Sequence, residues 1–62
     1  MNDRELLKTF VDVMFHKYGS YAHATGYLES TVVGLLEGND SIDDVRRRIA
    51  QAIEKETAKE TV

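Results

Sequence analysis

The sequence predicts an all-α fold, a small bundle of three to four helices. Three observations carry this prediction. The chain of 62 residues contains no proline, the residue that interrupts helices most strongly. Leu, Ala, Glu, Lys and Arg, which favour helices, are abundant. Apolar residues near both ends of the chain recur with a helical period.

Length, charge and hydropathy indicate the number of domains and the cellular compartment. We expect one helical domain over 1–57 and a frayed polar tail over 58–62. A net charge of −3 offers no general attraction to nucleic acid. No apolar run approaches the ~20 residues that cross a membrane, and the N-terminus lacks the apolar core of a signal peptide. These features predict a cytoplasmic protein without a membrane partner.

The first helix is predicted over 3–18. Asn2 or Asp3 can cap its start, and Gly19 is a good C-terminal stop. Its apolar residues cover roughly 200° of the helix surface, against the ~100° stripe of an ordinary surface helix: they are Leu6, Leu7, Phe10, Val11, Val13, Met14, Phe15 and Tyr18. Such a wide surface must be covered from several directions. The helix is therefore either central to the monomer or in contact with a second chain, and we expect a homodimer.

The last helix is predicted over 41–57. Ser41 and Asp44 form a capping-box-like start. A narrow apolar stripe follows and is expected to be buried, formed by Ile42, Val45, Ile49, Ala52 and Ile53.

The only basic cluster of the chain is Arg46, Arg47 and Arg48. A solvated helix face is one interpretation, because Asp43 with Arg47 and Asp44 with Arg48 are favourable i,i+4 pairs. Contact with phosphate groups is the other interpretation.

The central stretch, 18–38, holds all four glycines of the chain and only two charged residues, Glu29 and Glu37. In one interpretation, short helices over 20–25 and 29–37 are joined by a turn at Gly26. In the other, a single helix runs from Tyr21 to Glu37 through Gly26, which gives a plain three-helix bundle. The second interpretation rests on a 4-3-4-3 spacing of Tyr21, Thr25, Leu28, Val32 and Leu35.

The spacing of Ala22, Gly26, Val32 and Leu35 resembles the helix-turn-helix of Cro-like and phage-repressor-like DNA-binding proteins. The resemblance covers about twenty residues. It implies a small helix-turn-helix transcriptional regulator of phage or prophage type that binds double-stranded DNA as a homodimer. The binding face would consist of Ser30, Thr31, Val33, Gly34 and Glu37. Phosphate contacts would come from Lys17, Arg46, Arg47 and Arg48.

A function from another class is a small acidic protein-binding module that modulates or inhibits a larger partner. No Lys or Arg lies within the central stretch to contact phosphate groups, so its electrostatics favour a protein partner. The apolar anchors of such a module would be Tyr21, Tyr27, Val33 and Leu36, and tyrosine is common at interface hot spots.

Catalysis is not expected. His16 and His23 are seven residues apart and match no metal-ligand pattern, and the chain has no cysteine. A chain this short also struggles to enclose a substrate pocket of ~300–1,000 Å³. We therefore expect no enzyme activity, no cofactor and no metal.

Overall fold

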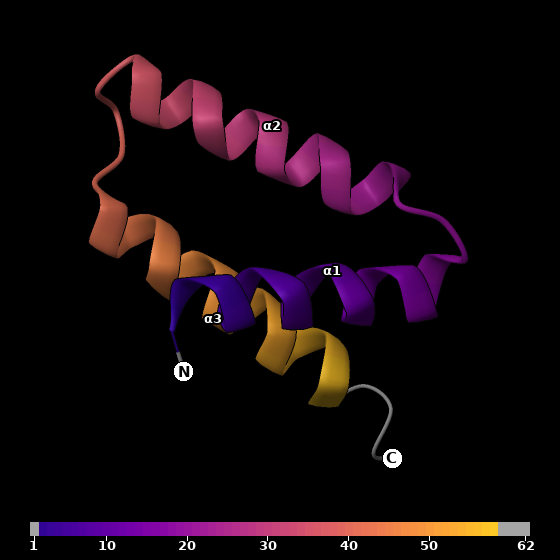
Figure 1. Ribbon diagram of the computed structural model, residues 1–62. Helices are drawn as coiled ribbons and strands as arrows, with labels where there is room; N and C mark the ends of the chain where they lie inside the picture. The colour runs from indigo at the N-terminus through magenta and orange to yellow at the C-terminus, as the bar shows by residue number, and fades with distance from the viewer. Residues whose placement is uncertain (1, 59–62) are drawn as a thin grey trace.

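The computed structural model describes residues 2–58 and contains three helices and no strand in that range (Figure 1). They are α1 (Asp3–Tyr18), α2 (Ala22–Leu36) and α3 (Ile42–Ala58). The predicted small all-α bundle is confirmed. Of the predicted frayed tail, Ala58 belongs to α3, and 59–62 lie outside the described residues.

Local sequence signals set the ends of α1 and the start of α3. The side chain of Asn2 accepts a hydrogen bond from the Glu5 backbone N–H at 2.9 Å, and Gly19 takes a left-handed conformation with φ of 73°. At α3, the Asp44 N–H donates to the Ser41 hydroxyl at 3.1 Å, and the Ser41 N–H donates to the Asp44 carboxylate at 3.4 Å. This reciprocal pair is the predicted capping box.

Helix α2 is continuous, so the predicted turn at Gly26 between helices over 20–25 and 29–37 is wrong. The single-helix interpretation is confirmed. Gly26 has no positive φ, unlike Gly19 and Gly38. An interior glycine costs only ~1 kcal/mol relative to alanine, and packing on both sides of Gly26, at Ala24 and Thr31, can offset that cost.

The C-terminal end of α2 is closed by two backbone hydrogen bonds around Gly38. The Asn39 N–H donates to the Gly34 carbonyl at 2.9 Å, and the Gly38 N–H donates to the Leu35 carbonyl at 3.1 Å. Gly38 itself has a φ of 76°. This is a Schellman motif, for which glycine is favoured because it has no Cβ to clash.

Helix α1 is the central element and contacts both α2 and α3 (Figure 1). The core is small and draws on all three helices: Phe10 and Met14 from α1, Ala24 from α2, and Ile49 from α3. The Phe10 ring also packs against Tyr27, with 5.0 Å between centroids. The expected central position of the first helix is therefore confirmed, and its self-association stays a prediction.

The core leaves part of the predicted apolar surface uncovered. On α1, Leu7, Phe15 and Tyr18 are about two-fifths exposed, and on α3, Ile42 is about half exposed. The expectation that Ile42 is buried with the rest of its stripe is wrong, because it stands at the first turn of α3, beside the edge of α1. Val45, Ala52 and Ile53 pack against the core as expected.

Candidate functional site

Helix α2 combines an apolar sequence with a poorly buried position. Between Ala22 and Leu36 its only Asp, Glu, Lys or Arg is Glu29, whereas nearly a third of the whole chain is charged. Yet Leu36 is 82% exposed, Val32 50% and Val33 46%. In Figure 1, α2 diverges from α1 toward its C-terminal end, the end of the helix to which these three residues belong.

A regular stripe runs along the outward side of α2. Ala22, Gly26, Glu29, Val33 and Leu36 are spaced 4-3-4-3, and all five are exposed. They lie opposite the buried Ala24 and Thr31 on the helix surface. We call these five residues the outer stripe. Because a helix rises 1.5 Å per residue, the outer stripe is about 21 Å long.

Two residues of the predicted binding face do not face outward. Thr31 is buried at 8% exposure, and its hydroxyl donates to the Tyr27 backbone carbonyl at 2.9 Å. Gly34 is covered by the Asp40 side chain, which occupies the space that a Cβ on Gly34 would need. The prediction that both present a free surface is therefore wrong: Thr31 lies on the buried side of α2, and the chain after α2 folds back over Gly34.

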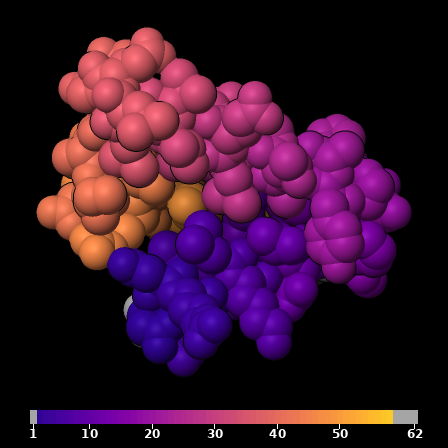
Figure 2. Space-filling view, turned by 45° about the horizontal axis from the view of Figure 1, so that its top comes forward, coloured from indigo at the N-terminus to yellow at the C-terminus, as the bar shows by residue number. Residues whose placement is uncertain are grey.

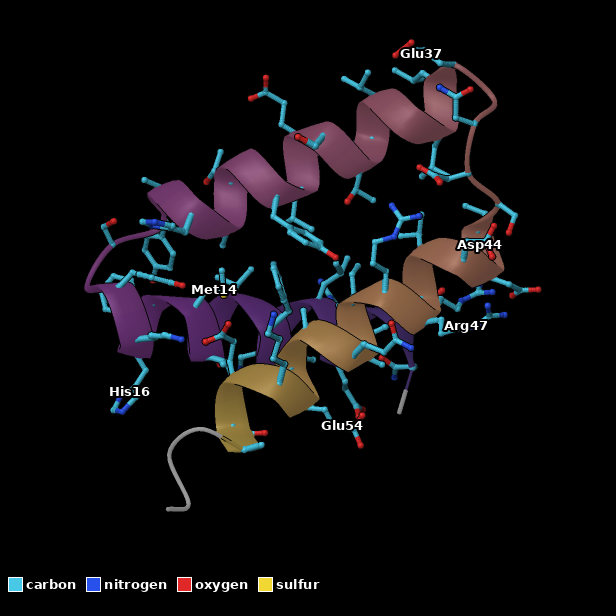
Figure 3. All side chains as sticks on the ribbon, turned by 180° about the vertical axis from the view of Figure 1, so that it is seen from behind. Met14, His16, Glu37, Asp44, Arg47 and Glu54 are labelled. Atoms are coloured by element: carbon cyan, nitrogen blue, oxygen red, sulfur yellow. The ribbon has the colours of Figure 1, made fainter. Side chains whose placement is uncertain are left out.

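Three other residues of that predicted face do reach solvent. Ser30 and Val33 are exposed on α2, and Glu37 caps its C-terminus and points away from the bundle (Figure 3). Sequence reasoning missed Ala22, Gly26 and Glu29 as members of an exposed stripe. The available signal was a second 4-3-4-3 register, offset by one residue from the predicted one.

The predicted apolar anchors of a protein-binding module also divide into exposed residues and residues packed on the core. Tyr21 is 57% exposed at the start of α2 and packs against Phe15 in a tilted arrangement, with 4.5 Å between ring centroids. Next to it, Tyr18 stacks on His23 at 3.9 Å. Tyr27 is only partly exposed and packs on the core, so it does not serve as an outward anchor.

All four predicted phosphate contacts are ion-paired. Lys17 pairs with Glu56, and Arg47 lies 3.8 Å from Asp44. Arg46 bonds Asp3 and Asp43, each at 2.9 Å, and Arg48 bonds Asp40 at 2.9 Å. Arg47 and Arg48 therefore have acidic partners as expected, but these are Asp44 and Asp40 rather than the predicted i,i+4 partners Asp43 and Asp44.

These contacts change the ionisation of the groups involved. The hydrogen bonds from Arg46 lower the pKa of Asp3, and the same bonds raise the pKa of Arg46. Bonding to Asp40 likewise raises the pKa of Arg48. The hydroxyl and backbone N–H of Ser41 lower the pKa of Asp44. Each shift favours the charged form, so a phosphate group would have to compete with carboxylates already in place.

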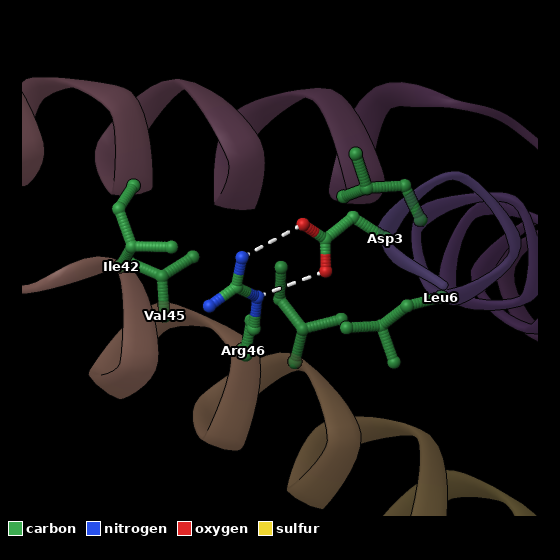
Figure 4. Close-up of a pocket in the computed structure, with 7 residues that line it drawn as sticks. Asp3, Leu6, Ile42, Val45 and Arg46 are labelled. Carbon is green, nitrogen blue, oxygen red and sulfur yellow. Dashed lines mark hydrogen bonds and ion pairs between the residues drawn. The ribbon is translucent and has the colours of Figure 1, made fainter. Parts of the chain in front are cut away.

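A shallow apolar groove lies between α1 and the start of α3 (Figures 2 and 4). The Asp3–Arg46 pair borders it, and its apolar lining consists of Leu6, Leu7, Ile42, Val45 and Ile49. Its volume of about 180 Å³ is below the ~300 Å³ of a typical small-molecule site. Among residues 2–58, no cluster of His, Asp or Glu could hold a metal ion.

The described helices include none long and apolar enough to cross a membrane. Comparisons with protein-family models, curated proteins and solved structures find no match to this chain.

Proposed function

We propose that this chain is a small protein-binding module that docks a partner through the exposed side of α2. The single observation that carries the proposal is the mismatch between the composition and the burial of that helix. The helix with the fewest charged residues exposes Val32, Val33 and Leu36 together in its last turns, and Tyr21 is exposed at its opposite end. Contiguous exposed apolar surface of this kind marks interaction sites.

The energetics of covering this surface favour binding. Burial of apolar area contributes roughly 25 cal/mol per Å², and the nearly fully exposed Leu36 has most of its side chain still to bury. Tyr21 presents an aromatic body with a polar tip, a combination enriched at interface hot spots. Neither residue belongs to the core, so binding would not require the domain to reorganise.

Binding to duplex DNA stays a prediction with less support. A helix-turn-helix reader projects its second helix from a turn, and α2 has no turn at Gly26. Affinity for DNA comes largely from Lys and Arg on phosphate groups, and here those side chains are occupied by carboxylates. Glu29 and Glu37 on the exposed face would also repel a duplex.

The proposal is tested by site-specific cross-linking in cells that express the chain. A photo-reactive amino acid is placed at Val33 or, as a control, at Glu54, which lies on α3 far from α2 (Figure 3). We expect a discrete protein adduct from position 33 that disappears in a Leu36→Ser background, and no such adduct from position 54. Equal labelling from both positions, or none from position 33, contradicts the proposal.

A mobility-shift titration on random duplex DNA provides the competing measurement. A phosphate-contacting protein loses affinity steeply between 50 and 200 mM salt. Salt-dependent binding that weakens in an Arg46→Ala, Arg47→Ala double variant would support the DNA function instead.

A further inference from the structure

We infer that the partner presents a basic amphipathic helix, which lies along the outer stripe with a Lys or Arg opposite Glu29. This inference rests on the proposed function and adds the chemistry of the partner. It draws on three features of α2: the spacing of the outer stripe, the sizes of its side chains and the sign of its charges.

The spacing is that of a helix-pairing surface. Apolar or small residues repeated 4-3-4-3 form the seam along which two helices pack at a shallow angle. Four of the five positions of the outer stripe hold such residues, and the exception is Glu29 at its centre. An extended peptide would need free strand edges, and residues 2–58 contain no strand.

The side chains of the outer stripe change in size along the helix. Ala22 and Gly26 leave the N-terminal half open, and no atom of residues 2–58 lies within 4 Å of the space that a Cβ on Gly26 would fill. A partner backbone can approach closely there. Val33 and Leu36 stand out from the other half and require apolar residues opposite them.

The outer stripe and the C-cap of α2 carry two charged residues, and both are acidic. Glu29 sits at its centre and has no ion-pair partner among the described residues, and Glu37 stands at its end. No Lys or Arg occurs between Lys17 and Arg46. A basic residue on the partner would neutralise Glu29, whereas an acidic partner would place like charges together.

The same charges disfavour a second copy of this chain as the occupant. In an antiparallel pair of α2 helices centred on Glu29, that residue meets its own copy. Centring the pair on Val33 instead brings Glu29 against Glu37, since both are four residues from Val33. A parallel two-fold pair also sets Glu29 against itself. Each of these arrangements opposes two acids. An antiparallel pair centred on Thr31 instead sets Glu29 of each copy against Val33 of the other, which covers both acids with an apolar side chain and supplies no cation.

The test uses the full chain and two synthetic helical peptides of about 20 residues, long enough to span the stripe. Both carry the same Leu and Ala stripe, and their flanking positions are Lys in one peptide and Glu in the other. Binding is followed by fluorescence anisotropy, and the site by amide chemical shifts of the ¹⁵N-labelled chain. We expect the Lys peptide to shift the Gly26 and Val33 resonances and to bind at least about threefold tighter than the Glu peptide, as an exposed charge pair allows.

Two charge-reversal variants test whether Glu29 itself, rather than the net charge of the chain, sets the preference for the Lys peptide. Glu29→Lys should invert the preference between the two peptides. Glu54→Lys makes the same change of charge on α3, away from the stripe, and should leave the preference in place. Inversion by both variants would show attraction to the net charge alone and would overturn the inference.

The remaining outcomes distinguish this inference from the proposed function. Failure of the Lys peptide to shift α2 resonances, or shifts of equal size and affinity with both peptides, overturns the basic partner. Cross-linking from position 33 would still test, independently of the peptides, whether α2 docks a partner protein. A dimer in sedimentation equilibrium that dissociates in Leu36→Ser would show that a second copy occupies the stripe. That result overturns the inference and leaves α2 as a protein-binding face.

Discussion

Arg48 on α3 holds the side chain of Asp40 over Gly34 at the end of α2. Its Nη2 lies 2.9 Å from Asp40 Oδ1, and the Asp40 carboxylate fills the space beside Gly34. The Asn39 and Asp40 backbone N–H groups donate to the Gly34 carbonyl on the same side. One ion pair thus connects α3 to the segment that closes α2, at the end where α2 diverges from α1 (Figure 1).

Removing either member of this pair should loosen the end of α2. Arg48→Ala and Asp40→Ala should each lower the thermal midpoint slightly and speed amide hydrogen exchange at Asn39 and Asp40. The double variant should lose no more than the larger single loss, because both substitutions break the same contact. Strictly additive losses would contradict the coupling. The measurement is a double-mutant cycle of thermal melts.

Substitution by alanine should change the stability differently at the two interior glycines of α2. Gly26 has helical backbone and open space at its Cβ position, so Gly26→Ala should stabilise the fold by ~0.5–1 kcal/mol. At Gly34 an added Cβ would displace Asp40 from Arg48, so Gly34→Ala should show no such gain. Urea unfolding of both variants measures the difference. Equal gains would mean that Asp40 does not cover Gly34.

The helix ends could be predicted from the sequence because each depends on a few adjacent residues. Asn2, Gly19 and Ser41 act through hydrogen bonds or backbone angles within one turn. The predicted turn at Gly26 was wrong because a glycine permits a turn but does not require one. The continuous helix is accompanied by packing on both sides of Gly26, at Ala24 and Thr31, which no local signal reports.

The inward face of α2 was harder to predict. Two sets of residues in α2 share the 4-3-4-3 spacing, so spacing alone does not identify the buried side. The structure buries the small Ala24 and the polar Thr31, whereas Val33 faces solvent. Burial of Thr31 is tolerated because its hydroxyl bonds the Tyr27 carbonyl within the same helix. The cover that Asp40 places over Gly34 depends on Arg48, eight residues further along the chain. Tertiary contacts of this kind leave no periodic signal in the sequence.

The small core makes Ile49 a sensitive position. It is 3% exposed and is the only fully buried side chain that α3 contributes among the described residues. Ile49→Ala should therefore cost ~2–5 kcal/mol. Arg47→Ala, two residues earlier on the exposed side of the same helix (Figure 3), should cost under ~0.5 kcal/mol. Thermal melts with equal midpoints for the two variants would remove α3 from the core.

Acid should weaken the fold through carboxylates whose pKa is lowered by folding. The Ser41 hydroxyl and N–H lower the pKa of Asp44, and Arg46 lowers that of Asp3, both from an ordinary value of 3.8. For such groups the stabilisation is complete above the unfolded pKa and is lost as the pH falls through the folded pKa. The thermal midpoint should therefore be steady above about pH 5 and fall as the pH drops below about 4.

The variants Asp44→Asn and Asp3→Asn identify the source of that loss. The introduced asparagine side chains cannot be protonated between pH 2 and 7. Each variant should therefore have a lower thermal midpoint at pH 7 than the wild type, and its thermal midpoint should fall less steeply in acid. The decline should be shallower still when both substitutions are combined, because the two carboxylates stand on different helices and have different partners. Thermal melts followed by circular dichroism between pH 2 and 7 provide the measurement. A decline in the double variant as steep as in the wild type would assign acid sensitivity to other carboxylates, and would show that neither the α3 cap nor the Asp3–Arg46 pair senses pH.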